Sequence, residues 1–340
     1  MPKWYTDIGN NSDVVLSTRV RLARNIKGIP FPNKISKEQA QQVVNMVDDA
    51  LKMLSIKFNR IDIASISEKE LSKLIESRYV SPDMRKTKIP AAVFISEDES
   101  ISIMVNEEDH IRLQSIFAGE QTQRAYDCLE KLDNYLADRL NYAISEKYGY
   151  LTSCLTNVGT GMRVSYMMHL PAVVETGMAE KLFATIGKLG VTVRGLYGEG
   201  TKPTGNIFQI SNQVTLGRSE NELMDNVCKI VNQIIEKEFE LRGKLADKKG
   251  IIIEDCVMRS LGILQNARVM QSKELMTLLS NLRLGIAGGY IKGITSADVN
   301  TLMVETTPAF LDGCDIERDV ARAKIIRDKL GKDDLNEFKV

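Results

Sequence analysis

The sequence predicts an α+β domain over residues 1–250 and a helical domain over residues 251–340. Short strand-like apolar runs occur mainly before the polar stretch Lys248-Lys249-Gly250, and the chain after it shows helical spacing. The helical repeat is seen at Leu275, Leu278, Leu279 and Leu282. A chain of 340 residues is long enough to bury more than one core, so two domains are expected.

Helix starts are marked by pairs of polar residues three positions apart, whose side chains each bond the backbone N–H of the other. Ser36 with Gln39 predicts one helix start, and Ser67 with Glu70 predicts another. Apolar residues at helical spacing follow both pairs. Further helices are expected over residues 121–147, 173–189 and 221–246.

Strands are predicted from short runs of β-branched and apolar residues. Ala91–Ser96 and Ser100–Val105 flank the acidic stretch Glu97–Glu99, a pattern typical of a hairpin. Further strands are expected over residues 163–170, 191–197 and 206–211, the last two around a loop rich in Gly, Thr and Pro.

The composition argues against several classes of function. The 45 Lys and Arg residues balance 45 Asp and Glu residues, so the net charge favours neither nucleic acid nor a membrane surface. The five cysteines are scattered without C-x-x-C spacing and no apolar signal segment begins the chain, which predicts a cytoplasmic protein without a zinc site. With only two histidines, His110 and His169, carboxylates are better candidates for proton transfer.

A basic segment, Ser17-Thr18-Arg19-Val20-Arg21, lies near the N-terminus. Side chains two residues apart on a strand point the same way, so Arg19 and Arg21 would form a phosphate clamp. A solvated basic edge strand is the alternative interpretation, and the segment taken alone favours it.

An acidic segment, Asn106–Arg112, follows the strand predicted to end at Val105. Its consecutive acids Glu107, Glu108 and Asp109 are costly unless they face water, a cation or a cationic substrate. An acidic surface turn would explain the segment equally well.

Two glycine-rich segments complete the set. In Cys154–Arg163, the glycines would let main-chain N–H groups approach an anion, and small polar neighbours of Cys154 would favour a thiolate. A small buried cysteine is the ordinary alternative. Arg194–Thr201 adds an arginine and Glu199 on a loop that would close over a substrate, unless it is only a hairpin tip.

Together these segments supply arginines for a transferring phosphoryl group and carboxylates for a cationic nucleophile. The combination resembles the catalytic domain of the ATP:guanido phosphotransferases (phosphagen kinases) over residues 14–245. The resemblance rests on four segments in the same order: STRVR, NEEDHIR, CLTNVGTGMR, and Arg194-Gly195 with Glu199 followed by Ile210-Ser211-Asn212.

Nearly the whole chain resembles the bacterial protein-arginine kinase family of this superfamily. STRVR begins at residue 17, which leaves no room for the N-terminal helical domain of kinases that act on small guanidines. VRGLYGEG and GNIFQISNQ are similar to that family's versions of these segments. Arg318-Asp319-Val320-Ala321-Arg322-Ala323 matches its RDxxRA phosphoarginine-binding motif.

The resemblance implies a role for each matching residue. Glu108 and Glu199 would hold the substrate guanidinium, align one nitrogen with the γ-phosphorus and accept its proton. Cys154 would lie beside the reactive nitrogen. The nucleotide site would comprise Ser17, Thr18, Arg19, Val20, Arg21, Tyr79, Arg112, Arg163 and Arg194.

Two positions depart from the family pattern. Tyr79 stands where relatives usually carry a histidine near the adenine. A tyrosine ring can stack on a base, so altered nucleotide affinity is expected. A second alignment places Lys202 opposite the second catalytic carboxylate, which would then be absent. We prefer Glu199 because that alignment keeps Arg194 as the phosphate arginine.

The C-terminal motif has its own physical interpretation. Arg318 and Arg322 are four residues apart on a helix expected to begin near Asp315, so they would share one face. Without the resemblance, a solvated helix of mixed charge would explain them. With it, both arginines would hold a phosphate and Asp319 a guanidinium, so that the site would sense phosphoarginine and modulate the active site.

The resemblance also implies an antiparallel sheet flanked by helices and a helical domain that forms a homodimer. It implies ATP and Mg²⁺ as cofactors, arginine-bearing proteins as substrates and a role in stress response. The implied partners are a heat-shock repressor, an activator protein and a Clp-type protease. Two alternatives stay open, a small-guanidine phosphagen kinase and a non-catalytic phosphoarginine-binding adaptor. An adaptor would need no phosphate clamp for ATP.

Overall fold

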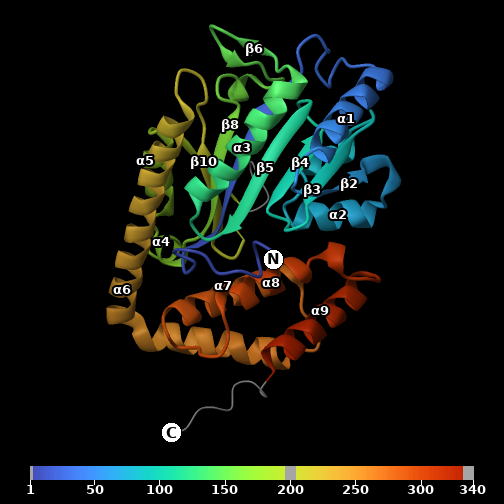
Figure 1. Ribbon diagram of the computed structural model, residues 1–340. Coiled ribbons are helices and arrows are strands. Elements are labelled where there is room, and N and C mark those ends of the chain that lie inside the picture. Colours follow the sequence, from blue (N-terminus) through green and yellow to red (C-terminus); the bar gives the residue numbers. More distant parts are fainter. Residues whose placement is uncertain (1–2, 196–203, 332–340) are drawn as a thin grey trace.

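The computed structural model describes residues 3–195 and 204–331. Within these residues, eight strands form one antiparallel sheet in the order β2-β3-β4-β5-β1-β8-β10-β9 (Figure 1). The strands are β1 (Val15–Arg24), β2 (Phe58–Asp62), β3 (Ala92–Ser96), β4 (Ile101–Val105), β5 (Ile111–Ala118), β8 (Met162–His169), β9 (Val191–Gly195) and β10 (Ile207–Asn212). A separate hairpin pairs β6 (Ile144–Ser145) with β7 (Gly149–Tyr150).

Helices lie over the sheet and below it. They are α1 (Lys37–Lys52), α2 (Glu68–Glu76), α3 (Thr122–Leu140), α4 (Pro171–Glu175), α5 (Ala179–Gly187), α6 (Glu220–Asn266), α7 (Ser272–Ala287), α8 (Ser296–Glu305) and α9 (Asp315–Leu330). Short 3-10 turns are η1 (Ile63–Ser65), η2 (Pro82–Lys86), η3 (Leu155–Asn157) and η4 (Pro308–Phe310). Figure 1 shows α1 and α3 in front of the sheet and α7 to α9 beneath it.

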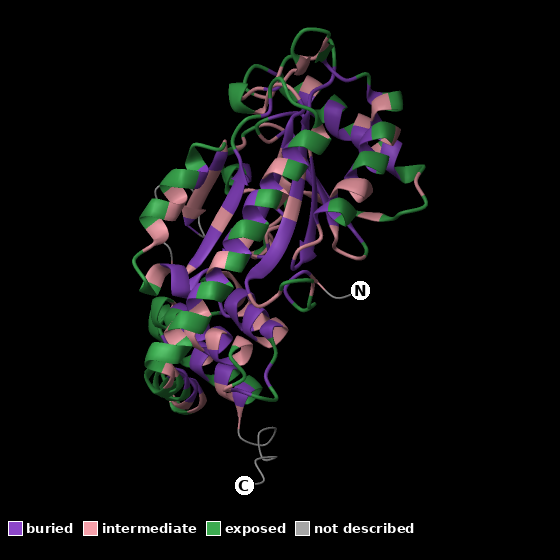
Figure 2. Ribbon diagram, turned by 90° about the vertical axis from the view of Figure 1, so that its left-hand side faces the viewer, coloured by how far each residue is buried: buried purple, intermediate pink, exposed green. Residues whose placement is uncertain are grey.

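Two hydrophobic clusters divide the interior between the faces of the sheet. One cluster packs Val20 and Leu22 of β1 under α1, α3 and the first part of α6. The other joins Met104 and Ile116 of the opposite face to α2 and to the C-terminal helices. Figure 2 shows the strands buried, while exposed residues lie on the outer sides of the helices. Helices therefore pack on both faces of the sheet, but they cover the second face, which carries Met104 and Ile116, only in part.

Most sequence-predicted elements are confirmed, and the exceptions have local causes. Ser36 and Ser67 cap α1 and α2 through complete capping boxes, and β3 and β4 form the predicted hairpin. The helix predicted over 121–147 ends at Leu140, because Asn141 adopts a left-handed conformation with φ 45°. The helix predicted over 173–189 is two helices, α4 and α5, separated at Gly177 with φ 68°.

The long helix α6 connects the sheet to the C-terminal helices. It was expected to end near residue 246, but it continues to Asn266 and bends at Lys249, whose φ of −135° and ψ of 22° are not helical. Beyond the bend it packs against α7 and α9. Among the described residues, no helix combines the length and apolar character needed to cross a bilayer.

Candidate active site

Strand β1 runs through the middle of the sheet, between β5 and β8. Strand alternation buries Val20 and Leu22 under the helix layer and turns Arg19 and Arg21 to the opposite face. The interpretation of this segment as a solvated edge strand is therefore wrong. A central strand with two arginines on one face needs negative charge nearby, from the protein or from a ligand.

The strand register gathers further arginines on the same face. Arg21 lies directly opposite Arg163 of β8, and Ala23, two residues further on, lies opposite Arg112 of β5. Arg194 of β9 lies opposite Gln209 of β10. We call this surface the arginine face; it consists of Arg19, Arg21, Arg112, Arg163 and Arg194.

The partners of Arg19 and Arg21 are few and uncharged. The Nη2 atom of Arg19 donates to Oε1 of Gln209 at 3.3 Å, and its Nε donates to Oγ of Ser165 at 3.4 Å. The buried Nε of Arg21 has no hydrogen-bond acceptor among the described residues. Neither arginine forms an ion pair within the described ranges 3–195 and 204–331.

The electrostatics of the face favour an anion. Burial, followed by the charges of Arg78, Arg163 and Arg112, lowers the pKa of Arg19 to about 9. Burial and the neighbouring arginines also lower the pKa of Arg21 well below its ordinary value. Like charges facing each other across a sheet are destabilising, and a bound polyanion would relieve this repulsion.

The three consecutive acids after β4 have different environments. The side chain of Glu107 is buried and pairs with Arg112 at 2.7 Å, whereas Glu108 pairs with Arg112 at 2.8 Å while its side chain remains 42% exposed. Burial raises the pKa of Glu108, and the charge of Arg112 opposes that shift. Asp109 is fully buried. Glu108 is therefore the acid of this turn that can reach a substrate.

Asp109 connects the acidic turn to the segment that carries Cys154. Its Oδ1 accepts hydrogen bonds from Nδ2 of Asn25 and from the backbone N–H of Ser153, both at 2.7 Å. Ser153 precedes Cys154, which is partly exposed, with its Sγ 3.0 Å from Oγ1 of Thr156. Cys154 is thus not the small buried hydrophobe of the alternative interpretation.

The glycines of this segment allow close packing against neighbouring backbone. A Cβ at Gly161 would lie 2.6 Å from the carbonyl oxygen of Ala23, and one at Gly159 would lie 2.4 Å from that of Thr215. The N–H of Gly159 donates to the carbonyl of Tyr150. Neighbouring backbone therefore leaves no space for a side chain at either glycine, and the expectation that these glycines open the main chain to an anion stays a prediction.

Two of the predicted nucleotide residues point to the face opposite the arginine face, and a third, Tyr79, packs on the same face as the arginines but is enclosed. Val20 is buried under the helix layer, and the hydroxyl of Thr18 donates to the carbonyl of Gly119 at 2.6 Å, on the same side as Val20. Tyr79 is 4% exposed and donates its hydroxyl to Glu99 at 2.5 Å. The side chains of these residues are therefore not presented to a nucleotide in this structure. Ser17, by contrast, lines a small cavity with Arg19.

Sequence reasoning missed Arg78, the residue before Tyr79. It has a left-handed backbone with φ 69°, lines the same cavity as Arg19, and its charge contributes to the lowered pKa of Arg19. In the sequence, its position next to Tyr79 was the one sign that linked Arg78 to the site. Its place beside β1 could not be predicted, because it results from the packing of α2 on the sheet.

Both histidines are structural. His110 accepts from the N–H of Ile26 at 3.0 Å and contacts the carbonyl of Pro30 at 2.9 Å, and burial lowers its pKa. His169 is buried beside Ser280, and burial followed by the charges of Arg283 and Arg242 lowers its pKa well below the ordinary value. Glu199 and the alternative Lys202 lie outside the described residues.

The C-terminal motif is split between the interior and the surface of α9. Arg322 is buried, donates to the carbonyls of Thr306 at 2.9 Å and Met270 at 2.7 Å, and pairs with Asp319. Arg318 is on the surface, where it pairs with Asp315 and donates to the carbonyl of Gly313. The expectation that both arginines hold one phosphate is not met in this structure, because the guanidinium of Arg322 is occupied inside the protein.

Comparison with known proteins agrees with this arrangement. Residues 39–241 match the family described as ATP:guanido phosphotransferase, C-terminal catalytic domain, and residues 250–339 match the protein-arginine kinase McsB C-terminal domain. The protein-arginine kinase of Geobacillus kaustophilus is 45% identical over 96% of this chain and 93% of its own length. That of Bacillus subtilis is 41% identical over 97% of this chain and 93% of its own.

Two solved structures share the fold. The duplicated taurocyamine kinase of Schistosoma mansoni, with bound transition state analog components, has a TM-score of 0.63 and 26% identity over 71% of this chain and 36% of that chain. A lombricine kinase has a TM-score of 0.62 and 22% identity over 72% of each chain. From the two family matches and the similarity over nearly the full length, the chain belongs to the ATP:guanido phosphotransferase family, in its branch of protein-arginine kinases.

Proposed function

We propose that the chain transfers the γ-phosphate of ATP to arginine side chains of proteins, with the arginine face as the phosphate site and Glu108 as a guanidinium ligand. The observation that carries this proposal is the pair Arg19 and Arg21, two desolvated guanidinium groups without ion pairs among the described residues, beside a half-exposed carboxylate. This is the charge pattern that a triphosphate and a guanidinium would complete.

In the proposed reaction, a guanidinium nitrogen attacks the γ-phosphorus, an N–P bond forms and the bond to the β-phosphate oxygen breaks. ADP leaves, and the proton of the attacking nitrogen passes to a carboxylate. Glu108 would orient this nitrogen, Glu199 would be the second carboxylate, and Cys154 would lie beside the reactive nitrogen. Arg112, which pairs with Glu108 at 2.8 Å, would exchange this contact for the phosphates.

Mg²⁺ fits this site as a companion of ATP. Within the described ranges, no group of three His, Cys, Asp or Glu side chains is arranged to hold a metal ion. Mg²⁺ is commonly bound through one or two carboxylates together with substrate phosphates. The Oε1 of Glu107, which has no hydrogen-bond donor among the described residues, is an oxygen available nearby, because the same side chain pairs with Arg112 of the arginine face. Bound there, Mg²⁺ would neutralise phosphate charge.

The C-terminal helices would carry regulation and assembly. Arg318 and Asp319 would bind phosphoarginine, and Arg322 would position Asp319 by its ion pair. Ile251, Ile252 and Met258, exposed on α6 beyond its bend, would contribute to a homodimer. We place the domain boundary at residue 250, supported by the bend at Lys249 and the limits of the two family matches. A repressor, an activator and a protease of the stress response would be its partners.

The experiment is incubation of the purified chain with Mg-ATP and casein, with free arginine in a parallel reaction. Mass spectrometry under non-acidic conditions locates the phosphate, because the N–P bond is labile to acid. Phosphate on protein arginines, lost in Glu108→Ala and Glu199→Ala, supports the proposal and the preferred loop alignment. Phosphate only on free arginine indicates a small-guanidine kinase, and phosphoarginine binding without transfer indicates an adaptor.

A further inference from the structure

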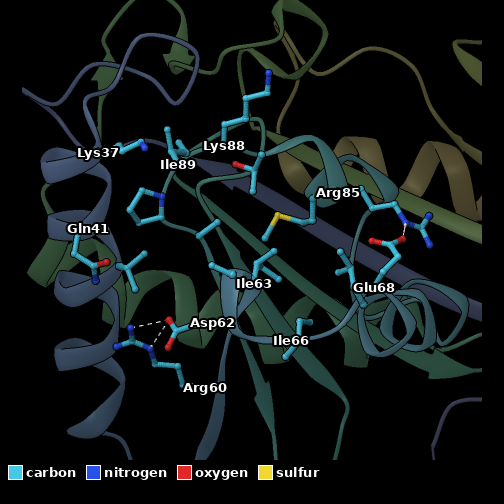
Figure 3. Close-up of a pocket in the computed structure, with 17 residues that line it drawn as sticks. Lys37, Gln41, Arg60, Asp62, Ile63, Ile66, Glu68, Arg85, Lys88 and Ile89 are labelled. Carbon is cyan, nitrogen blue, oxygen red and sulfur yellow. Dashed lines mark hydrogen bonds and ion pairs between the residues drawn. The ribbon is translucent and has the colours of Figure 1, made fainter.

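A groove lies beside the edge strand β2, outside the site described above, where Arg60 and Asp62 of that strand line it together with residues 87–91, which lead into β3. It has a volume of about 620 Å³ and lies between α1 and the α2–η2 region (Figure 3). Within the described residues β2 pairs only with β3, so the main-chain groups on its other side have no neighbouring strand. Edge strands with such free groups are able to pair with an extended segment.

The groove has an apolar floor and a positively charged rim. Ile63, Ile66 and Ile89 line its interior. At one end Arg60 pairs with Asp62 at 2.7 Å. A second charge pair, between Arg85 and Glu68 at 2.6 Å, closes another side.

Two cations of the rim are not neutralised. Lys37 and Lys88 are exposed and form no ion pair within residues 3–195 and 204–331. Figure 3 shows them on the same side of the groove, on either side of Ile89. The groove therefore favours a segment with both apolar and acidic side chains.

The same groove is joined to the acidic turn of the active site. The side chain of Asn106 donates from Nδ2 to the carbonyl of Pro90 and to that of Ala40 in α1, both at 2.8 Å. Thr87, on the groove wall, donates to the carbonyl of Asn106 at 3.3 Å. Asn106 precedes Glu107 and Glu108, so both walls of the groove meet the turn that carries the proposed guanidinium ligand.

We propose that this groove binds an extended acidic and apolar segment of the substrate polypeptide that flanks the target arginine. The inference rests on the proposed protein-arginine kinase function and adds to it a preference for particular sequences. Lys37 and Lys88 attract the acidic side chains, Ile63 and Ile66 contact the apolar ones, and the adjoining edge strand β2, paired on one side only among the described residues, is open to the main chain of the segment.

The test uses two peptides of equal length with one arginine each. One carries Asp and Glu alternating with Leu on both sides of the arginine, and the other carries Ser and Gln in place of the acids. We expect a KM about tenfold lower for the acidic peptide, an interaction of about 1.4 kcal/mol, with similar kcat. The difference should shrink as the ionic strength rises to 1 M, because salt screens exposed charges.

The charge reversal Lys37→Glu with Lys88→Glu should abolish the preference by raising KM for the acidic peptide. The matched control is Lys181→Glu with Lys188→Glu, the same charge change at exposed positions on and after α5, beside the opposite edge of the sheet. Retained preference in the control and lost preference in the groove variant support the proposal. Equal KM values for both peptides in the unmodified chain, or equal loss in both variants, overturn it.

Failure of the groove and failure of the proposed function give different results. Phosphoarginine on both peptides without a KM difference rejects only the groove. No phosphoarginine on any substrate rejects the proposed function. In that case fluorescence anisotropy of a labelled acidic peptide, with its arginine replaced by lysine, tests independently whether the groove binds an acidic segment. Tighter binding than that of the neutral peptide supports the groove proposal, and equal binding overturns it.

Discussion

Two sets of arginines in this molecule have the spacing of a phosphate clamp, yet their surroundings differ. Arg21 lies opposite Arg163 across the sheet, the charges of other arginines act on Arg19, and neither Arg19 nor Arg21 forms an ion pair within residues 3–195 and 204–331. Arg322 is buried and bonded to two carbonyl groups and Asp319. Arg318, four residues earlier, lies at the surface.

The difference shows that spacing determines which face an arginine occupies, whereas the fold determines whether its guanidinium remains available. A guanidinium satisfied by internal acceptors stabilises the fold, because removing it leaves buried polar groups without partners. A guanidinium left among like charges costs stability and is available to a ligand. Four substitutions and pH profiles test this contrast.

The largest expected effect is on stability, at Arg322. Arg322→Met would leave the carbonyls of Thr306 and Met270 without donors and Asp319 without its partner. We expect the free energy of unfolding to fall by about 3–5 kcal/mol, measured by urea denaturation. Arg318→Met is the control and should change it by less than about 0.5 kcal/mol. Equal losses would show that Arg322 has no special structural role.

At Arg21 we expect the opposite pattern. Arg21→Met removes a desolvated cation opposite Arg163, so the free energy of unfolding should stay equal or increase. The rate constant kcat should fall by about 10²–10³-fold, as when one charge-stabilising donor is removed from an active site. Arg259→Met, at an exposed position of α6, should change neither quantity. A lower stability with normal kcat would place Arg21 among the structural arginines.

At the surface of α9, Arg318→Ala should weaken phosphoarginine binding by about 10–100-fold, because one charge-assisted contact contributes about 1.5–3 kcal/mol. Isothermal titration with free phosphoarginine measures the affinity. Circular dichroism should show an unchanged fold, since Arg318 lies at the surface and bonds only Gly313 and Asp315 among the described residues. Unchanged affinity in the double variant of Arg318 and Arg322 would remove the sensor proposal.

The smallest effect concerns pH. Glu108 must be ionised to hold a guanidinium, and burial raises its pKa, so activity should be lost on acidification at a pH above the ordinary glutamate value of about 4.3. Because the charge of Arg112 lowers the pKa of Glu108, Arg112→Met should shift this acidic loss of activity to still higher pH. ADP release measures the rate without exposing phosphoarginine to acid. If the activity of this variant were instead lost at lower pH than in the unmodified chain, the assignment of Glu108 would be contradicted.

Local signals in the sequence predicted local structure correctly. The capping boxes at Ser36 and Ser67 and the β3–β4 hairpin involve residues close in the chain, so the pattern contains the whole interaction. The end of α3 was missed because the left-handed Asn141 begins a bridge from Tyr142 to Ile26, far away in sequence. The place of Arg78 near Arg19 likewise depends on a distant contact.

The sequence alone was enough to predict the family, from the order of the segments that it shares, and to propose the arginines of β1 and Glu108 as its site residues. Which of these groups are available depends on contacts between segments that are distant in the chain. The tertiary structure buried Asp109 as an anchor for the segment of Cys154, enclosed Tyr79, and satisfied Arg322 internally. The physical reason is that the availability of a polar side chain depends on the acceptors that packing brings within 3 Å or so, and these come from residues distant in the chain.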